Sequence, residues 1–458
     1  EAGGCGEESE EATSLYDQEP VEETDTEGAL IDKGIACASA GQFEEAISWY
    51  DKVLLRDPEN PDALNNKGVA LAALKKGEEA LLLFNTLLKI TPEHELGLTN
   101  RGGVLADLKR YKEACACFDL VIRINPDNAD AWYNKGVTLA SLGNYDKAVG
   151  CYNQVLRISP DNINALNNKG IAYAALKKYD EAILCYNNAL RINPEYELSL
   201  INKGVALAEL RKYEEAVACF DAVIRINPDY TEAWYNKGIA LAILGKTDEA
   251  VLCYDQVLSA DPENAGAWEN KGLALAVLEK SDEAVLCYDQ VIRIDPDNAD
   301  AWYNKGRALA RLKKYDEAVA CFDNVLRINP KNEPALLSKG AALTDLEEDE
   351  DAIGCFDAVL QINPDNADAL IDKGVNLANL KRYDAAIASY DQALRIHPDH
   401  TEALNNKGIA YAALKKYEEA LECFNAVLKL HPENELASLI RGITLAALKL
   451  SDEGNGIV

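Results

Sequence analysis

The sequence contains no methionine, only four histidines and no Asn-x-Ser/Thr glycosylation signal. No run of about 18 apolar residues occurs, so we expect neither a membrane span nor a hydrophobic signal segment in the sequence as given. Basic residues are few beside acidic ones, 46 against 77, and the net charge is −31. Because this charge repels phosphate backbones and anionic lipids, we expect neither nucleic acid nor a membrane surface as a main partner.

Residues that commonly carry catalysis are scattered. His94, His397, His400 and His431 fall between the predicted helices, and none has a potential metal ligand four residues further along a helix. A glycine-rich phosphate loop and a serine elbow are both absent. We therefore predict a protein that is not an enzyme, with no cofactor and no dedicated metal site. Loops such as residues 125–130 are interpreted as turns and helix caps, while weak calcium binding by the acidic surface as a whole stays open.

What the sequence does contain is a period of 34 residues. Twelve prolines and twelve alanines keep this period, and an aromatic residue stands four positions after each of these alanines. A fixed period of this length indicates stacked supersecondary units. Thirteen glycines follow the same spacing: Gly34, Gly68, Gly102, Gly136, Gly170, Gly204, Gly238, Gly272, Gly306, Gly340, Gly374, Gly408 and Gly442.

Each unit is predicted to be a pair of antiparallel helices. Apolar residues recur at steps of three and four from Trp132 to Leu142 and again from Tyr145 to Ile158. Gly136 and Ala148 would let the two helices approach closely. The proline that follows ends the second helix, and the polar residues after it can cap the next one.

These residues resemble the tetratricopeptide repeat family. The resemblance covers about residues 29–453, with twelve consecutive units and no insertion. It implies an all-α fold, a right-handed superhelical α-solenoid of antiparallel helix pairs, whose concave groove is lined by the first helices and binds protein. One departure is that a lysine or arginine stands where the family usually has leucine before the glycine. The family pattern is matched by Trp132, Gly136, Leu139, Tyr145, Ala148, Tyr152 and Pro160.

The repeat register predicts three parts of the chain. Residues 1–28 form an acidic segment with a degenerate second helix at about 10–18, and residues 29–435 form twelve tandem units. Residues 436–458 form an incomplete thirteenth unit, a first helix with a short tail. Ala2 to Cys5, followed by an acidic stretch, resemble a lipoprotein or secretion cleavage site. This favours a secreted or cell-surface location over a cytoplasmic one, with a trimmed end as the alternative.

Nine of the twelve cysteines share one repeat position, for example Cys117 and Cys151. Equivalent positions in neighbouring units should be about 10 Å apart, whereas a disulfide needs Cα atoms within about 7 Å. We therefore interpret these cysteines as small buried residues.

A ladder of amides and cations marks the candidate groove. The resemblance to tetratricopeptide repeat proteins implies that asparagines at these positions can hold a peptide backbone, and the adjacent cations would favour an acidic peptide. The alternative to peptide binding is a structural role, in which the asparagines form hydrogen bonds to adjacent helices and the lysines lie over the core. The predicted groove residues are Asn66, Lys67, Asn100, Arg101, Asn134, Lys135, Asn168, Lys169, Asn202, Lys203, Asn236, Lys237, Asn270, Lys271, Asn304 and Lys305.

The two ends of the repeat array are complementary halves of one unit. Ala12, Leu15 and Tyr16 fall in register with the second helices, whereas Leu445 and Leu448 belong to a first helix without a partner. The favoured hypothesis is therefore head-to-tail self-assembly into a filament or surface structure. The alternative is a soluble adaptor whose groove binds an extended segment of another protein.

Overall fold

The computed structural model describes residues 26–455, with side chains for residues 26–450. The predicted helix at residues 10–18, with Ala12, Leu15 and Tyr16, lies outside this part of the chain. Within the described residues every secondary-structure element is an α-helix. Packing divides the described residues into two compact units, the first ending at Leu210 and the second beginning at Arg211.

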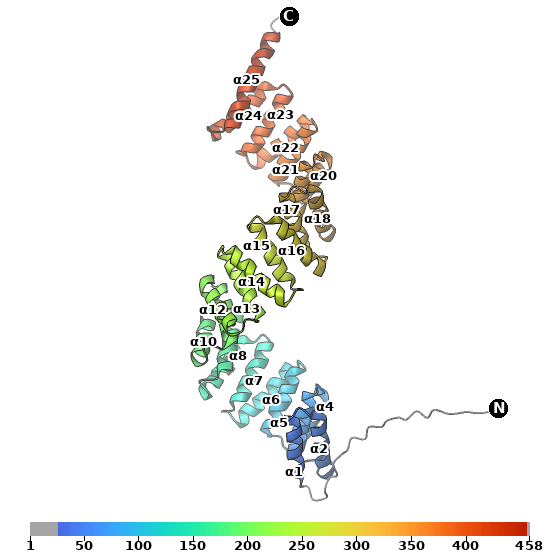
Figure 1. Cartoon of the computed structure of the whole chain (residues 1–458), viewed down its shortest axis with the longest axis vertical. Coiled ribbons are helices and arrows are strands. Elements are labelled where there is room, and N and C mark those ends of the chain that lie inside the picture. Colours follow the sequence, from blue (N-terminus) through green and yellow to red (C-terminus); the bar gives the residue numbers. More distant parts are fainter. Residues whose placement is uncertain (1–25, 456–458) are drawn as a thin grey trace, which may run out of the picture. The chain divides into compact units, whose positions relative to one another are not determined.

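In both units the odd-numbered helices are the first helices of the repeats and the even-numbered helices are the second helices (Figure 1). The helices of the first unit are α1 (Glu27–Ser39), α2 (Phe43–Arg56), α3 (Pro61–Ala73), α4 (Gly77–Ile90), α5 (Glu95–Asp107), α6 (Tyr111–Ile124), α7 (Ala129–Ser141), α8 (Tyr145–Ile158), α9 (Ile163–Ala175), α10 (Tyr179–Ile192) and α11 (Glu197–Glu209). The helices of the second unit are α12 (Tyr213–Ile226), α13 (Thr231–Ile243), α14 (Thr247–Ala260), α15 (Ala265–Val277), α16 (Ser281–Ile294), α17 (Ala299–Arg311), α18 (Tyr315–Ile328), α19 (Glu333–Asp345), α20 (Asp349–Ile362), α21 (Ala367–Asn379), α22 (Tyr383–Ile396), α23 (Thr401–Ala413), α24 (Tyr417–Leu430) and α25 (Glu435–Asn455).

Within each unit, each helix packs on the next helix in the chain, and first helices of neighbouring repeats also touch, as α1 touches α3 and α15 touches α17. This arrangement is that of an α-solenoid built from helix pairs. It confirms the predicted fold class in both units.

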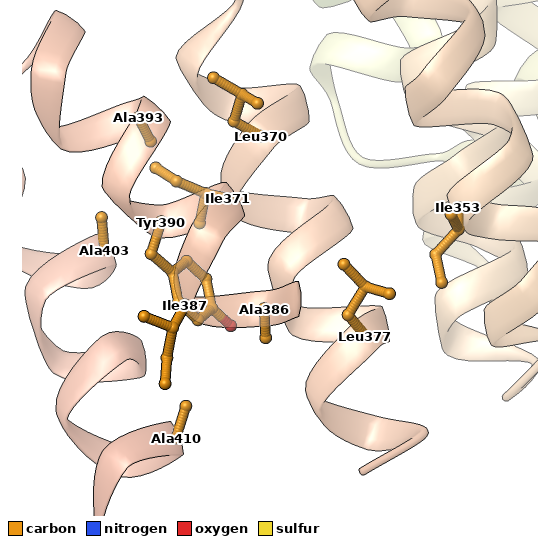
Figure 2. Close-up of a cluster of buried hydrophobic side chains, with 10 residues drawn as sticks. All are labelled: Ile353, Leu370, Ile371, Leu377, Ala386, Ile387, Tyr390, Ala393, Ala403 and Ala410. Atoms are coloured by element: carbon orange, nitrogen blue, oxygen red, sulfur yellow. The ribbon is translucent and has the colours of Figure 1, made fainter. Parts of the chain in front are cut away.

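The core repeats one contact, between the periodic glycine and the aromatic residue sixteen positions later. A Cβ atom placed on Gly374 would lie 2.4 Å from Cε1 of Tyr390, so only glycine leaves room for the ring. Tyr390 is 1% exposed and packs with Leu377 of α21 and Ala410 of α23 (Figure 2). Each aromatic side chain therefore joins its own helix pair to the next repeat.

The loops between repeats act as helix caps, as the sequence predicts. Asn128 Oδ1 accepts a hydrogen bond from the backbone N–H of Ala131 at 2.9 Å, and Asn162 does the same for Ala165 at 2.9 Å. Trp132 also fixes the loop to the helix, because its indole N–H donates a hydrogen bond to the carbonyl of Pro126 at 2.9 Å. The side-chain oxygen atoms of these loops thus accept hydrogen bonds from the first backbone N–H groups of the following helices.

The nine cysteines at the shared position are free and buried, which confirms their interpretation as packing residues. Burial raises the pKa of Cys151 and Cys253 to about 11. These thiols therefore stay protonated near neutral pH and form part of the core.

Candidate binding surface on the first helices

Two positions of the repeat bring polar and apolar groups to one face of every first helix. The asparagine two residues before the glycine is half-buried, and the residue directly after the glycine is exposed at most repeats. These positions are three residues apart, so they are neighbours on the surface of a helix. We call this surface the first-helix face.

The residue after the glycine forms an aliphatic stripe, which the sequence analysis did not identify. The stripe could have been found from the sequence, since a β-branched residue or leucine follows the periodic glycine in most units. The exposed members are Ile35 (44%), Val69 (42%), Val137 (37%), Ile171 (42%) and Val205 (38%) in the first unit, and Leu273 (40%), Ile409 (42%) and Ile443 (62%) in the second. Repeated exposure of large apolar side chains at one position is typical of a contact surface.

The asparagines beside the stripe form a ladder, and only some of their side-chain amides have hydrogen-bond partners. Four of them donate a side-chain hydrogen bond to the first helix of the preceding repeat. These bonds join Asn100 to Asn65 (3.0 Å), Asn168 to Tyr133 (2.9 Å), Asn202 to Asn167 (3.3 Å) and Asn270 to Tyr235 (2.9 Å). Within residues 26–450 the side-chain amides of Asn134, Asn236, Asn304 and Asn406 have no hydrogen-bond partner. These four can therefore bind a ligand without breaking an existing bond.

The predicted groove lysines are largely neutralised by the protein itself. Lys135 Nζ lies 2.5 Å from Asp119 Oδ1, and Lys271 Nζ lies 2.6 Å from Asp255 Oδ1. The same pairing joins Lys67 to Asp51, and the lysines are only about a fifth exposed. In each pair the aspartate belongs to the preceding second helix, sixteen residues earlier in the chain. The cations therefore join neighbouring repeats and present little charge to a ligand.

Lys169 and Lys203 differ from this pattern. The residues sixteen positions earlier are Asn153 and Asn187, and neither lysine forms an ion pair within the part of the chain that the structure describes. Arg101 is different again, since it donates to Asn85 Oδ1 at 2.9 Å and to Cys117 Sγ at 3.0 Å. The first unit thus keeps two unpaired cations next to each other on the first-helix face.

Two repeats have an aspartate at the ladder position, Asp32 in α1 and Asp372 in α21, where most repeats have asparagine. Burial, followed by repulsion from Glu402 and Asp368, raises the pKa of Asp372 to about 6. The charge on this part of the face therefore changes in the mildly acidic range.

The predicted self-association residues on α25 lie near an unfilled glycine position. A Cβ atom placed on Gly442 would meet nothing within 4 Å, whereas at Gly408 it would lie 2.7 Å from the Phe424 ring. Leu445 is 37% exposed and Leu448 is half-buried. The helix extends to Asn455, because Ser451 to Glu453 contain no residue that breaks a helix.

Among residues 26–455, no group of three or more His, Cys, Asp or Glu side chains is arranged to hold a metal ion. Over the same residues, no helix combines the length and apolar character that crossing a bilayer requires.

Several solved structures are similar to the chain. The complex titled APC/C hetero-tetramer Cut9-Hcn1 is 16% identical with a TM-score of 0.41, over 92% of this chain and 96% of that chain. YrrB, described as a TPR protein with an unusual peptide-binding site, is 28% identical with a TM-score of 0.37, over 41% and 97%. A tetratricopeptide repeat protein from Parabacteroides merdae is 19% identical with a TM-score of 0.44, over 54% and 98%. No curated protein matches the chain.

Family profiles match most of the repeat array. One tetratricopeptide repeat profile matches residues 29–95, 201–265, 244–296, 270–333 and 337–401, which together exceed half of the chain. A second matches residues 129–162, 163–196 and 401–434, and a TPR repeat profile matches 102–143. The helix pairs, the glycine and aromatic contact and these matches agree, and the chain belongs to the tetratricopeptide repeat family.

Proposed function

We propose that this repeat scaffold associates with other proteins without catalysis, by binding an extended peptide segment on its first-helix face. The observation that carries the proposal is the aliphatic stripe beside half-buried asparagine amides. Side chains such as Val137 and Ile171 offer apolar contact, while the free amide of Asn134 can pair with a peptide backbone. Backbone pairing gives affinity for any extended chain, and the stripe selects its side chains.

The spacing of the repeats indicates the conformation of the ligand. Packed helices lie about 8–10 Å apart, so stripe residues of neighbouring first helices should have a similar spacing. A polyproline II chain rises about 3.1 Å per residue with three residues per turn, or about 9 Å per turn. One turn of such a chain therefore spans one repeat. We expect bound segments to carry an apolar residue at every third position.

A random-peptide library selected against the purified full-length chain tests this proposal. The selected peptides should show the three-residue apolar period, and their affinity can be measured by fluorescence anisotropy. The quadruple variant Asn134→Ala, Asn236→Ala, Asn304→Ala, Asn406→Ala should weaken binding about fivefold for each hydrogen bond that a bound peptide loses, since a net hydrogen bond contributes about 1 kcal/mol. The matched control is Asn153→Ala on the exposed face of α8, which should bind unchanged. Peptides without the period, or equal affinities for the variant and control, would contradict the proposal.

A second candidate function, head-to-tail self-assembly, is favoured by the surface of α25. Leu439 is 64% exposed there, although its counterpart Ile371 is 2% exposed against the neighbouring repeat. Tyr16 stands in register with the rings that cover the other glycines, so a second copy could place it over Gly442. Such a contact does not close on itself and would produce filaments.

Sedimentation velocity over a concentration series, followed by electron microscopy, tests this second candidate. Ala12→Asp with Tyr16→Asp on one end, or Leu445→Asp with Leu448→Asp on the other, should each abolish polymers. A mixture of the two variants should also stay unpolymerised, apart from capped dimers joined by the remaining intact ends. Polymers that persist in both variants would exclude this contact.

A further inference from the structure

One repeat of the second unit contains a cavity where other repeats place a ring. The first residue of the second helix is tyrosine in seven repeats, but it is Ser281 in α16. In the first unit, Tyr179 occupies this position, packs with Tyr186 and Ala206, and donates to Glu209 Oε2 at 3.4 Å. The space beside Ser281 is therefore the space that a tyrosine side chain fills elsewhere.

The cavity beside Ser281 has a volume of about 640 Å³ and lies between α15, α16 and α17. Its lining includes Tyr288, Ala308 and Ala276. These residues stand three repeats after Tyr186, Ala206 and Ala174, which surround Tyr179 in the first unit. The residues that surround a tyrosine ring in the first unit are thus present again around this cavity, whereas the ring itself is absent.

The cavity has a net positive lining, because Arg307 and Arg311 line it together with one carboxylate, Glu279, whereas the equivalent site has one charge of each sign, Glu209 and Lys177. Arg311 replaces the glutamate that accepts from Tyr179, and Arg307 takes the stripe position one turn earlier on α17. Arg311 Nη1 donates to the carbonyl of Ala276 at 3.0 Å, and Arg307 lies over the Tyr303 ring at 5.8 Å. Within the described residues neither guanidinium forms an ion pair. Both positive charges lower the pKa of Tyr288, although its burial raises that pKa to about 12.

The cavity is continuous with the proposed binding surface. Asn304 and Leu273, which also line it, belong to the asparagine ladder and the aliphatic stripe. A side chain from a segment on the first-helix face can therefore enter without any movement of the helices. The guanidiniums of Arg307 and Arg311 can donate to the carboxylate of an acidic residue next to that side chain, although the protein as a whole has a net charge of −31.

We propose that this cavity anchors a tyrosine side chain, next to an acidic residue, from an extended peptide bound on the first-helix face. The ring occupies the vacant tyrosine space, and Arg311 donates to the phenol oxygen. Arg307 pairs with the adjacent carboxylate. This inference rests on the proposed peptide-binding function and adds a side-chain preference at one repeat.

The test uses a labelled peptide with the sequence of residues 7–20, EESEEATSLYDQEP, which contains Tyr16 followed by Asp17. Fluorescence anisotropy measures its binding to the full-length chain carrying Tyr16→Ala, so that the chain's own tyrosine does not compete. Ser281→Tyr fills the cavity with the residue that seven other repeats use, and Ser281→Ala keeps it open. We expect Ser281→Tyr to weaken binding at least tenfold and Ser281→Ala to leave it unchanged.

The double variant Ser281→Tyr, Arg311→Glu rebuilds the pair seen at Tyr179 and Glu209 and guards against a folding defect in Ser281→Tyr. Its melting temperature should equal or exceed that of the parent, and it should bind as weakly as Ser281→Tyr. A peptide with alanine in place of the tyrosine should lose the same tenfold on the parent chain and should be insensitive to Ser281→Tyr.

Other results would overturn the cavity proposal. If the tyrosine and alanine peptides bind equally, the cavity is not an anchor, but binding on the first-helix face still stands. If binding depends on tyrosine but ignores Ser281→Tyr and is lost with Leu439→Asp, the peptide occupies α25. If neither peptide binds while library peptides do, only the cavity proposal fails. If no peptide of either source binds, the proposed function fails as well.

Discussion

At the scale of single residues, close packing depends on which of two adjacent glycines faces a ring. A Cβ atom on Gly102 would lie 2.7 Å from Cε1 of Phe118, a distance that real Cβ contacts do not reach. A Cβ atom on Gly103 would meet nothing within 4 Å. The two glycines share one helix and differ in this contact, so they form a matched pair.

Gly102→Ala should lower the free energy of unfolding by about 1–3 kcal/mol, because the added methyl group must displace the buried Phe118 ring. Gly103→Ala should raise it by about 0.5–1 kcal/mol, because alanine favours the helix. Urea unfolding followed by circular dichroism measures both. Equal effects of the two substitutions would contradict the packing described for the repeat.

Asp372 allows a test by pH. Its pKa is raised from 3.8 to about 6, so the folded chain binds the proton more tightly than the unfolded chain, and this group lowers stability as pH rises between those values. Asp372→Asn should therefore stabilise the protein by about 1 kcal/mol at pH 7, allowing for solvent screening, and by little at pH 4.

The control for this prediction is Asp323→Asn, which removes the carboxylate that pairs with Lys339 Nζ at 2.6 Å. This variant should lose about 0.2–1 kcal/mol at pH 7, the opposite sign. Urea midpoints at pH 4 and pH 7 distinguish the two. A stabilisation by Asp372→Asn that is the same at both pH values would rule out the charge as its cause.

At the scale of elements, each first helix from α1 to α23 is followed by a left-handed residue in the short turn to its partner. Lys177 adopts a φ of 59° there, and Gly143 has a φ of 75° at the equivalent position. A left-handed conformation costs a residue with a side chain about 1–2 kcal/mol, whereas glycine adopts it freely.

Lys177→Gly should stabilise the protein by about 0.5–1 kcal/mol, because relief of the strain exceeds the extra entropy of glycine in the unfolded chain. The reciprocal change, Gly143→Lys, should destabilise it by a similar amount. Thermal melts of the two variants provide the measurement. A loss of stability in Lys177→Gly would show that the lysine side chain contributes more than its backbone strain costs.

The helices and their caps could be predicted from the sequence because they depend on local signals. The prolines and the apolar steps recur in every unit and a capping side chain precedes most first helices, so each boundary is indicated many times; Tyr196 and Tyr230 are the exceptions among the caps. The extent of α25 could not be predicted in this way, because Ser451 to Glu453 carry neither a stop signal nor an apolar period. The helix continues to Asn455 because no residue from 451 to 453 interrupts it.

At the scale of the whole molecule, the chain is a repeat array in which the first-helix face recurs from repeat to repeat within each unit. The candidate site was only partly predictable from the sequence. The asparagine positions follow from the register, but the partners of the lysines do not, since Lys135 and Asp119 belong to different repeats. The cavity at Ser281 has a signal in the sequence, one tyrosine replaced by serine, whose meaning requires the packing around Tyr179.

The location of a bound peptide tests the central claim most directly. A library-selected peptide carrying a central benzoylphenylalanine would be photo-crosslinked to the full-length chain, and the attachment sites identified by mass spectrometry. The account predicts attachment on first helices, at or next to stripe residues such as Val137, Ile171 and Leu273. Attachment at Leu184 or Leu252, which are exposed on second helices, would contradict it.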